Sequence, residues 1–324
     1  MSNAKFEIPF GIGTLADGKP AVIVDDHAIA IAALGARRAL PAGLESPQEM
    51  RQLMPLWQQW HDWLRGQDLK PSPAEGWVHI DAQKFGPPVP EPWDMFSTYH
   101  NYERPSRVTG RSDPPKAERV LPDMFFGSKS SLAAHGDTVH IEHGRIKFDF
   151  EVEVTVVIGK TAFRVPAERA DEYIAGYAIA NDLTMHHAWW RPIRAKSPIN
   201  DNIRMKNFPG YTPMSRAIVP RDLVGDPKDL AVKAWVGGRL KQDTRTNKML
   251  WSVPELVEYL SHIMPLRPGT LILTGSPEEL PVPPGEEYKG IQPGEKVLCE
   301  VEKLGRLENL IVEQTGRQPH ETPV

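Results

Sequence analysis

The chain has a single cysteine, Cys299, among its 324 residues. One thiol cannot form an intramolecular disulfide, and it cannot supply the several thiolates of a structural zinc site or an iron–sulfur cluster. Apolar and polar residues alternate around Cys299, which is typical of a strand with one buried face. We therefore interpret Cys299 as a small buried side chain and not as a reactive thiol.

Long hydrophobic runs and blocks of like charge are also missing. No stretch of about 18 apolar residues occurs, and the N-terminus lacks the apolar core of a signal peptide. The 38 Lys and Arg residues nearly balance the 42 Asp and Glu residues, and they do not cluster as phosphate-backbone binding requires. We therefore expect a soluble, cytoplasmic protein with neither nucleic-acid nor membrane partners.

Proline, by contrast, is abundant: its 32 residues are close to twice the usual share of about 5%. Many of them lie in segments 71–92, 105–122 and 277–293. We interpret residues 71–92 as a linker between a small N-terminal domain (1–70) and a larger domain (93–324). Residues 104–123 lack any hydrophobic period, and a loop of this length in a compact domain is usually either functional or disordered. Because it directly follows Glu103, we interpret it as an active-site lid.

The N-terminal domain is expected to contain a hairpin and a helix. Asp17-Gly18 lies between apolar stretches and predicts the hairpin turn. Residues 46–49 read Ser-Pro-Gln-Glu and predict a capped helix start, with Pro55 kinking or restarting the helix. The apolar residues that follow recur at three- and four-residue spacing and indicate a packed face in preference to a ligand site: Leu53, Leu56, Trp57, Trp60, Trp63 and Leu64.

Strand patterns dominate the larger domain. Apolar residues alternate from 146 to 158, and further strands are expected at 173–180, 231–236, 270–273, 297–301 and 307–312. One helix is expected from a Ser252 cap to Ile263. Since no βαβ periodicity is visible, the predicted class is a β-rich mixed α/β fold.

Several familiar motifs are absent or incomplete. Gly11-Ile-Gly13 leads into a turn and not into a helix, so it does not form a dinucleotide fingerprint. His135, His140 and His143 could hold zinc, but they lie beside glycine turn signals. We therefore favour exposed turn histidines.

Three carboxylates stand out. Glu151 and Glu153 lie two apart in a strand, so they project from one face about 7 Å apart. Alone they would be a solvated face, but Asp182 ends an apolar strand where it can meet them. Three oxygen ligands suit Mg²⁺, Mn²⁺ or Ca²⁺. His100 and Glu103 form a possible base and orienting carboxylate, if that segment is a helical turn.

From about Pro92 to Glu313, these residues resemble the fumarylacetoacetate hydrolase family. The resemblance rests on motifs in family order: the Glu151/Glu153 strand, the strand ending in Asn181-Asp182, the His100-x-x-Glu103 pair, Met205-Lys206-Asn207 and Thr274-Gly-Ser-Pro277. It implies a mixed β-sandwich roll with a small N-terminal domain, and a homodimer.

The resemblance also implies residue roles. Glu151, Glu153 and Asp182 would hold a divalent metal that polarises a carbonyl and stabilises the enolate leaving group. Asp94 matches a fourth metal ligand, although its distance from His100 along the chain is one residue short of the family spacing. His100, oriented by Glu103, would activate water, and Lys206 would stabilise the oxyanion.

The sequence departs from the family at the residues that bind the substrate carboxylate. A family lysine falls on Gly127 with Lys129 nearby, a family arginine falls on His186, and Arg245 replaces an asparagine. Trp189 is as consistent with a pocket wall as with a core position. The expected substrate-binding residues are therefore His186, Lys129, Arg245, Thr274, Tyr99 and Trp189.

These observations predict a metal-dependent hydrolase of organic acid or aromatic catabolism. It would cleave a C–C bond in a small 1,3-diketone or diketo acid, as in acylpyruvates or fumarylacetoacetate. A 2-keto acid decarboxylase, hydratase or isomerase on the same fold is the alternative. A non-catalytic scaffold is a third interpretation, which the complete set of carboxylates argues against.

Overall fold

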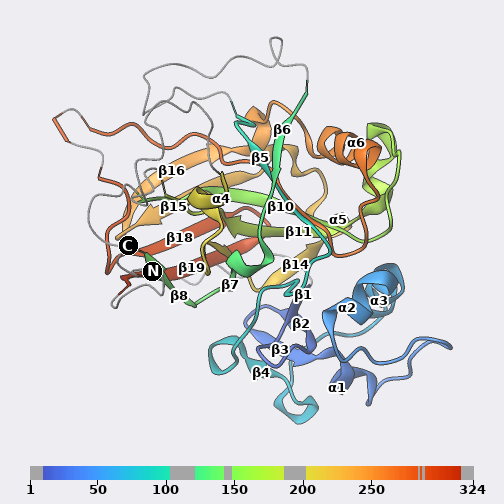
Figure 1. The fold of residues 1–324 in the computed structure, drawn as a ribbon. Coiled ribbons are helices and arrows are strands. Elements are labelled where there is room, and N and C mark those ends of the chain that lie inside the picture. The colour runs from blue at the N-terminus through green and yellow to red at the C-terminus, as the bar shows by residue number, and fades with distance from the viewer. Residues whose placement is uncertain are drawn as a thin grey trace, which may run out of the picture.

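The computed structural model describes residues 10–102, 121–141, 148–185, 202–283, 285–286 and 289–314. Within them, strands dominate and helices are short (Figure 1). The helices are α1 (Ile31–Gly35), α2 (Met50–Leu53), α3 (Trp57–Arg65), α4 (Asn202–Lys206), α5 (Arg221–Val224) and α6 (Val253–Ile263). No helix in these described ranges is long and apolar enough to cross a membrane.

The largest sheet runs in the order β4-β3-β2-β1-β14-β11-β10-β17-β5-β6, and β13 and β7 extend it beside β11. In chain order these strands are β1 (Gly11–Thr14), β2 (Pro20–Val24), β3 (His27–Ala30), β4 (Val78–His79), β5 (Met95–Tyr99), β6 (Asp123–Phe126), β7 (Leu132–Ala134), β10 (Val152–Ile158), β11 (Ile174–Asn181), β13 (Thr212–Met214), β14 (Ala217–Pro220) and β17 (Leu271–Leu273). The sheet therefore continues from the N-terminal unit into the larger body through the β1–β14 pair.

A second sheet covers one face of β10 and β11. Its order is β16-β15-β18-β19-β8, with β8 (Thr138–Ile141), β15 (Ala231–Val236), β16 (Arg239–Arg245), β18 (Lys296–Val301) and β19 (Gly305–Glu313). A short pair, β9 (Phe148–Asp149) and β12 (Thr184–Met185), stands apart. Cys299 of β18 is fully buried in the core between the sheets, as the sequence predicts.

Both faces of β10 are buried. Val152, Val154, Val156 and Ile158 enter the core shared with the second sheet, whereas Val157 enters a core shared with the N-terminal unit. Glu153 projects on the same face as Val157, and it is only 1% exposed. The polar face of this strand is therefore not solvated, although the alternation alone would suggest that it is.

The N-terminal unit largely follows its sequence signals. β1 and β2 form an antiparallel hairpin, with Gly18 left-handed in the turn at φ 89°. A 3₁₀ turn containing Pro55 separates α2 from α3, which confirms the restart. The predicted helix start at Ser46 is wrong: α2 begins at Met50, because the backbone of Glu49 is extended, with φ −139° and ψ 151°.

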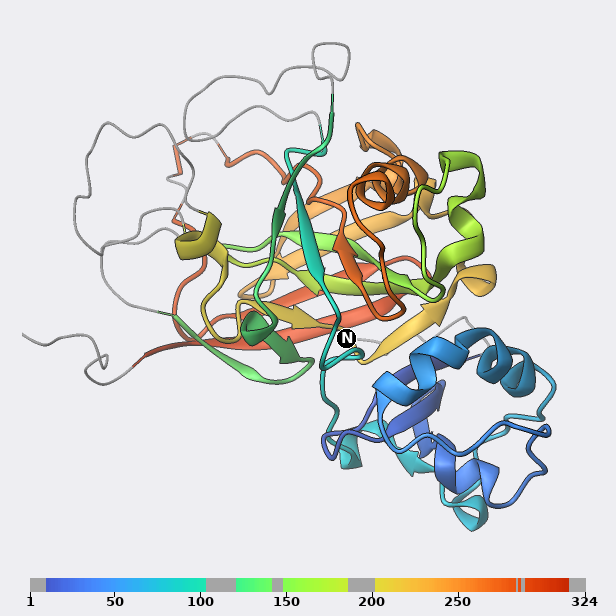
Figure 2. The same cartoon turned by 45° about the vertical axis from the view of Figure 1, so that its right-hand side comes forward.

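The segment predicted as a linker is partly ordered into this unit. β4 lies within residues 71–92 and pairs with β3, so this stretch adds a strand to the sheet before crossing to β5. Figures 1 and 2 both show the N-terminal unit, in blue, projecting from the β14 side of the larger body. The ends of β10 and β11 that carry the acidic residues are at the other side of that body.

Most strand predictions for the larger domain are confirmed, with one break. The predicted strand over 146–158 is divided into β9 and β10 at Phe150 and Glu151. The helix α6 has the predicted capping box, in which Ser252 and Glu255 satisfy each other's backbone groups.

Candidate active site

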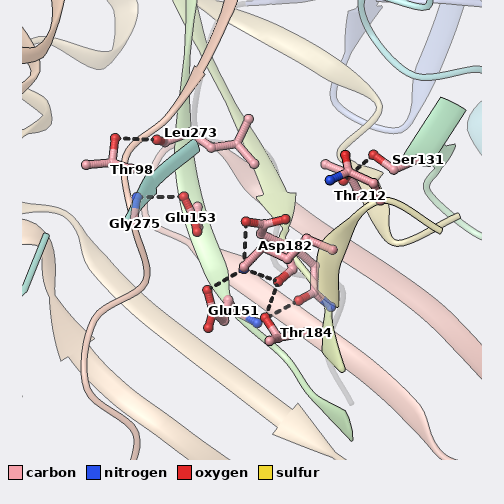
Figure 3. Close-up of polar contacts among 12 residues, drawn as sticks. Thr98, Ser131, Glu151, Glu153, Asp182, Thr184, Thr212, Leu273 and Gly275 are labelled. Carbon is pink, nitrogen blue, oxygen red and sulfur yellow. Dashed lines mark hydrogen bonds and ion pairs between the residues drawn. The ribbon is translucent and has the colours of Figure 1, made fainter. Parts of the chain in front are cut away.

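Three carboxylates converge where β10 begins and β11 ends. Glu151 precedes β10, Asp182 follows β11, and the antiparallel register pairs Val152 with Asn181 between them. The backbone N–H of Asp182 donates to the carbonyl of Glu151 at 2.9 Å, which holds the two residues together. With Glu153 they form a group whose ligand oxygens all lie within 4.8 Å of one another (Figure 3).

Lys206 is the cation of this group. It is the last residue of α4, and its Nζ lies 2.9 Å from Glu151 Oε2 and 2.7 Å from Asp182 Oδ2. The lysine side chain is only 5% exposed, and that of Asp182 4%. Among the described residues, one ammonium group therefore faces three carboxylates, which gives this part of the site an excess of negative charge.

The pKa values of Glu153, Asp182 and Lys206 reflect both this excess of negative charge and burial. Burial raises the pKa of Glu153 well above its ordinary value, and the neighbouring charge of Asp182 raises it further. Burial also raises the pKa of Asp182, against the lowering effect of Lys206. For Lys206, burial disfavours the ammonium form, but the carboxylates of Asp182, Glu151 and Glu153 outweigh it and raise the lysine pKa.

This donor set fits a hard divalent cation. Three carboxylates without thiolate or imidazole match the preferences of Mg²⁺, Mn²⁺ and Ca²⁺. A dication would also neutralise the negative charge that Lys206 leaves uncompensated. The residues that would hold it are Glu151, Glu153 and Asp182.

A turn after β17 positions Glu153. The backbone N–H of Gly275 donates to Glu153 Oε2 at 2.6 Å (Figure 3). Gly275 is left-handed at φ 86°, and a Cβ there would lie 2.9 Å from that of Asn101. The close approach and the backbone angle both require glycine.

The hydroxyl of Thr274 hydrogen-bonds to the backbone of β10 and does not point into an open pocket. It is fully buried and donates to the carbonyl of Val154 at 2.8 Å. The structure therefore does not support the expectation that this side chain binds substrate, because its single proton is already committed inside the sheet.

The segment that carries His100 folds over the same turn. β5 ends at Tyr99, whose ring stacks on that of His100 at 3.7 Å between centroids. His100 itself is left-handed at φ 50°, an angle uncommon for residues other than glycine and often retained at functional sites. Tyr102 then forms an isolated bridge with Met249, so this stretch is not the helical turn assumed for the His100–Glu103 pair.

Three neighbours of His100 join the site although the sequence did not single them out. The hydroxyl of Ser97 hydrogen-bonds to the Asp182 carboxylate. The Asn101 amide donates to the carbonyls of Thr274 and Trp251. Burial and the charge of Glu153 raise the pKa of Tyr102, which places its phenol near that carboxylate. The one sequence signal was the presence of polar residues, Ser97 and Thr98, in a buried strand.

Two predicted site residues are not brought to the carboxylates. Asp94 precedes β5, and its backbone carbonyl accepts from the N–H of Leu271 at the start of β17. Glu153 is bound by the N–H of Gly275, beyond the other end of β17. Asp94 is absent from the group of ligand oxygens, so the fourth-ligand assignment lacks structural support. Arg245 ends β16, and its guanidinium is engaged by Asp229 and Glu302 on the surface.

Lys129 lies closer to the site. It is exposed in a 3₁₀ turn, and the preceding Ser128 donates its backbone N–H to the side chain of Asn207, next to Lys206. Glu103, His186, Trp189 and His143 lie outside the described residues, as does most of the segment interpreted as a lid. His140 is exposed as expected, whereas His135 is half-buried.

Comparisons with known proteins agree with this geometry. The family model described as "Fumarylacetoacetate (FAA) hydrolase C-terminal" matches residues 94–312. The bifunctional isomerase/decarboxylase of 4-hydroxyphenylacetate degradation from Escherichia coli is 33% identical over 245 residues, covering 74% of this chain and 52% of that protein. Maleylpyruvate hydrolase from Aquipseudomonas alcaligenes is 36% identical over 184 residues, 57% of this chain and 58% of that protein.

The chain thus spans about half the length of these curated relatives. The crystal structure of maleylpyruvate hydrolase from Sphingobium sp. SYK-6, in complex with manganese(II) and pyruvate, has a TM-score of 0.71. It shares 20% identity, and the match covers 94% of this chain and 100% of that one. This likeness confirms the expected β-rich fold, and the family match extends over more than half of the sequence. The chain belongs to the fumarylacetoacetate hydrolase family.

Proposed function

We propose that this protein is a metal-dependent hydrolase that cleaves a C–C bond in a diketo acid of the acylpyruvate class. The observation that carries the proposal is the largely buried group of Glu151, Glu153 and Asp182, in which Lys206 pairs with Glu151 and Asp182. Two relatives named maleylpyruvate hydrolase support it, one by 36% identity and one by its fold.

Glu151, Glu153 and Asp182 are the proposed ligands of a divalent metal, Mg²⁺ or Mn²⁺. When bound, such a metal supplies Lewis-acid polarisation of the substrate keto oxygens. The related Sphingobium hydrolase was crystallised with manganese(II) and pyruvate, which fits a hard cation and a 2-keto acid. The Gly275 N–H contacts Glu153, and Lys206 contacts Glu151 and Asp182, so all three carboxylates are oriented before any ligand arrives.

The other chemistry is assigned to the side chains around this group. His100 is the proposed base that removes a proton from water, so that the hydroxide adds to the distal carbonyl of the substrate. Lys206, which its acidic neighbours keep charged, would stabilise the oxyanion formed there. Collapse of that oxyanion breaks the C–C bond and releases a carboxylic acid and the enolate of a 2-keto acid. The proton that His100 took from water then returns to the enolate carbon and gives the 2-keto acid.

Substrate recognition is proposed to involve Lys129, His186 and Tyr99. Lys129 is exposed beside the Asn207 segment, where its ammonium is available to a substrate carboxylate. Tyr99 is half-buried and stacked on His100, so it can form part of the wall next to the base. Glu103 remains the proposed partner that orients His100.

An isomerase or decarboxylase acting on a 2-keto acid is the second candidate. The 33% identity to the Escherichia coli isomerase/decarboxylase favours it. Such a reaction would use the same carboxylates, because it also needs a stabilised enolate. It differs from hydrolysis in that no water is added.

Product analysis separates these candidates. The protein with Mg²⁺ or Mn²⁺ is incubated with a panel of acylpyruvates and unsaturated 2-keto diacids, and the products are identified by mass spectrometry. Hydrolysis yields two fragments with one oxygen from ¹⁸O-labelled water, decarboxylation releases CO₂, and isomerisation leaves the mass unchanged. Conversion of diacids without water incorporation would overturn the hydrolase proposal. Size-exclusion chromatography with light scattering tests the proposed homodimer.

A further inference from the structure

A second cluster of metal-binding side chains lies in the N-terminal unit, where β3 pairs with β4. His27 and His79 are directly opposed in the antiparallel register. Residues paired in this way project from the same face of a sheet and can touch. The two imidazole rings are 5.4 Å apart between centroids and nearly perpendicular, at 80°.

One carboxylate contacts both rings. Asp26 Oδ1 lies 2.6 Å from Nδ1 of His27, and Asp26 Oδ2 lies 3.4 Å from Nε2 of His79. A second acid, Asp81, places Oδ2 at 3.6 Å from Nδ1 of His79. The side chains of His27, His79 and Asp26 are 31%, 44% and 60% exposed, so an ion can reach them from solvent.

The chemistry of this cluster differs from that of the active site. Two imidazoles and a carboxylate suit zinc, nickel or copper, whereas magnesium and calcium prefer an all-oxygen shell. With metal–nitrogen bonds of about 2 Å, two tetrahedral imidazole ligands bring their ring centroids to about 5 Å, close to the observed separation. Once His79 Nδ1 is released from the backbone N–H of Asp81, the Asp81 carboxylate, now 3.6 Å away, would accept the Nδ1 proton, as carboxylates commonly do for metal-bound histidines.

Binding here requires a small rearrangement. Among the described residues, the three active-site carboxylates are the group whose ligand atoms already lie within 4.8 Å. At β3 and β4 the side chains must rotate to converge on one point, and the backbone N–H of Asp81 must give up its bond to His79 Nδ1. Half-exposed side chains can change rotamer without disturbing a packed core, so this change is accessible.

We propose that His27, His79 and Asp26 form a binding site for a late first-row divalent metal, with zinc as the first choice, that fastens β4 to β3. β4 is only two residues long and lies in the proline-rich segment 71–92. A metal bound to both strands would link residues that are far apart in the chain, and such a link adds stability by closing a long loop. Figure 1 shows β3 and β4 in the blue unit, away from β10 and β11.

The test counts zinc ions bound to the tag-free protein by equilibrium dialysis. The carboxylate group can also take zinc, so the expected result is a difference in stoichiometry: His27→Ala and His79→Ala each bind one ion fewer than wild type. Asp26→Asn is expected to weaken that ion about tenfold or more. His262→Ala is the matched control, because His262 is an exposed histidine on α6 whose Nδ1 faces the carbonyl of Glu258.

Thermal unfolding supplies an independent readout. Zinc is expected to raise the Tm of wild type more than that of His79→Ala, whereas magnesium raises both equally. The two histidine variants should unfold at the wild-type temperature in EDTA. Full zinc stoichiometry in both, or no anomalous zinc peak between His27 and His79 in a zinc-soaked wild-type crystal, would overturn the proposal.

Discussion

The side-chain amide of Asn101 donates a hydrogen bond to the carbonyl oxygen of Thr274 at 2.8 Å. This contact joins the left-handed turn that carries His100 to the turn whose next residue, Gly275, holds Glu153. Asn101 is 1% exposed, and its side chain also donates to and accepts from the backbone of Trp251. The proposed base and one proposed metal ligand are therefore positioned by a single buried amide.

Replacement of Asn101 by Ala is expected to lower kcat while leaving metal affinity within a few-fold of wild type. Loss of the amide frees the His100 turn, and displacement of a catalytic group by about 1 Å can cost about two orders of magnitude. Stability should fall by about 1–3 kcal/mol, because buried backbone groups lose their partners. Steady-state kinetics and urea unfolding measure the two effects.

Asn309→Ala is the matched control for this variant. Asn309 is also a buried asparagine that donates to two carbonyls, but it lies in β19 of the second sheet. It should lose similar stability and keep its kcat. If both variants lose kcat in proportion to stability, Asn101 has no special positioning role.

Substitution of Glu153 by Gln is expected to abolish metal-dependent activity without destabilising the metal-free protein. The glutamine oxygen can still accept from Gly275, and the change removes a buried carboxylate whose pKa burial has raised. Differential scanning calorimetry should show a Tm in EDTA equal to or above that of wild type. The Tm increase on adding Mg²⁺ or Mn²⁺ should disappear. Glu300→Gln on β18, whose carboxylate pairs with Arg306, should retain the increase.

Removal of the Lys206 charge is expected to have the opposite effect on the metal-free protein. In Lys206→Met, Asp182 and Glu151 lose their ammonium partner in a buried position, which commonly costs about 3–5 kcal/mol. A bound dication should recover part of this loss, so urea unfolding with and without Mn²⁺ is the measurement. Equal stability of the variant and wild type in EDTA would contradict the charge balance described here.

The stability of the protein is expected to fall with decreasing pH partly through His135. Burial, with a smaller effect from Arg216, lowers the pKa of His135 to about 3. The unfolded chain takes up a proton on this histidine below about pH 6.5, and the folded protein resists doing so. The contribution is therefore present in full above pH 6.5 and is lost as the pH falls toward 3. His135→Asn should flatten the unfolding free energy between pH 6.5 and 4, whereas exposed His140→Asn should not.

Lys129 and Arg245 are expected to differ in their effect on substrate binding. Arg245 is already paired with Asp229 and Glu302, so Arg245→Ala should leave KM unchanged. Lys129→Ala should raise KM with little change in kcat, as expected for loss of a substrate-carboxylate contact. A raised KM in Arg245→Ala would show instead that Arg245 binds substrate, as its position in the family motif suggested.

Much of the candidate site is readable in the sequence because it depends on local pattern. Strand alternation places Glu151 and Glu153 on one face, and an apolar strand ends in Asp182. Family motifs in the correct order then connect these positions with His100 and Lys206. The structure brings ligand oxygens of both glutamates and Asp182 within 4.8 Å of one another, and Lys206 pairs with Glu151 and Asp182.

Other features of the candidate site depend on contacts between segments that are separate in the chain, so the sequence did not predict them. Arg245 stands where the family has an asparagine, yet its guanidinium pairs with Asp229, in the turn before β15, and with Glu302, directly after β18. Thr274 lies in a family motif, but its hydroxyl is used by β10. Asn101 and Tyr102 carry no pattern of their own and become part of the site only because β5 and β17 run side by side.

The sequence alone determines the chemical character of this protein: three carboxylates that are candidate hard ligands, a single cysteine, and a β-rich chain with proline-rich segments. These follow from residue types and from periods of two to four residues, which act over short stretches of chain. The tertiary structure decides which acids are buried, which cations are already paired and which strands meet. Those properties depend on contacts between separate elements of the fold, as between Glu153 and Gly275 or Lys206 and Asp182, and no local pattern encodes them.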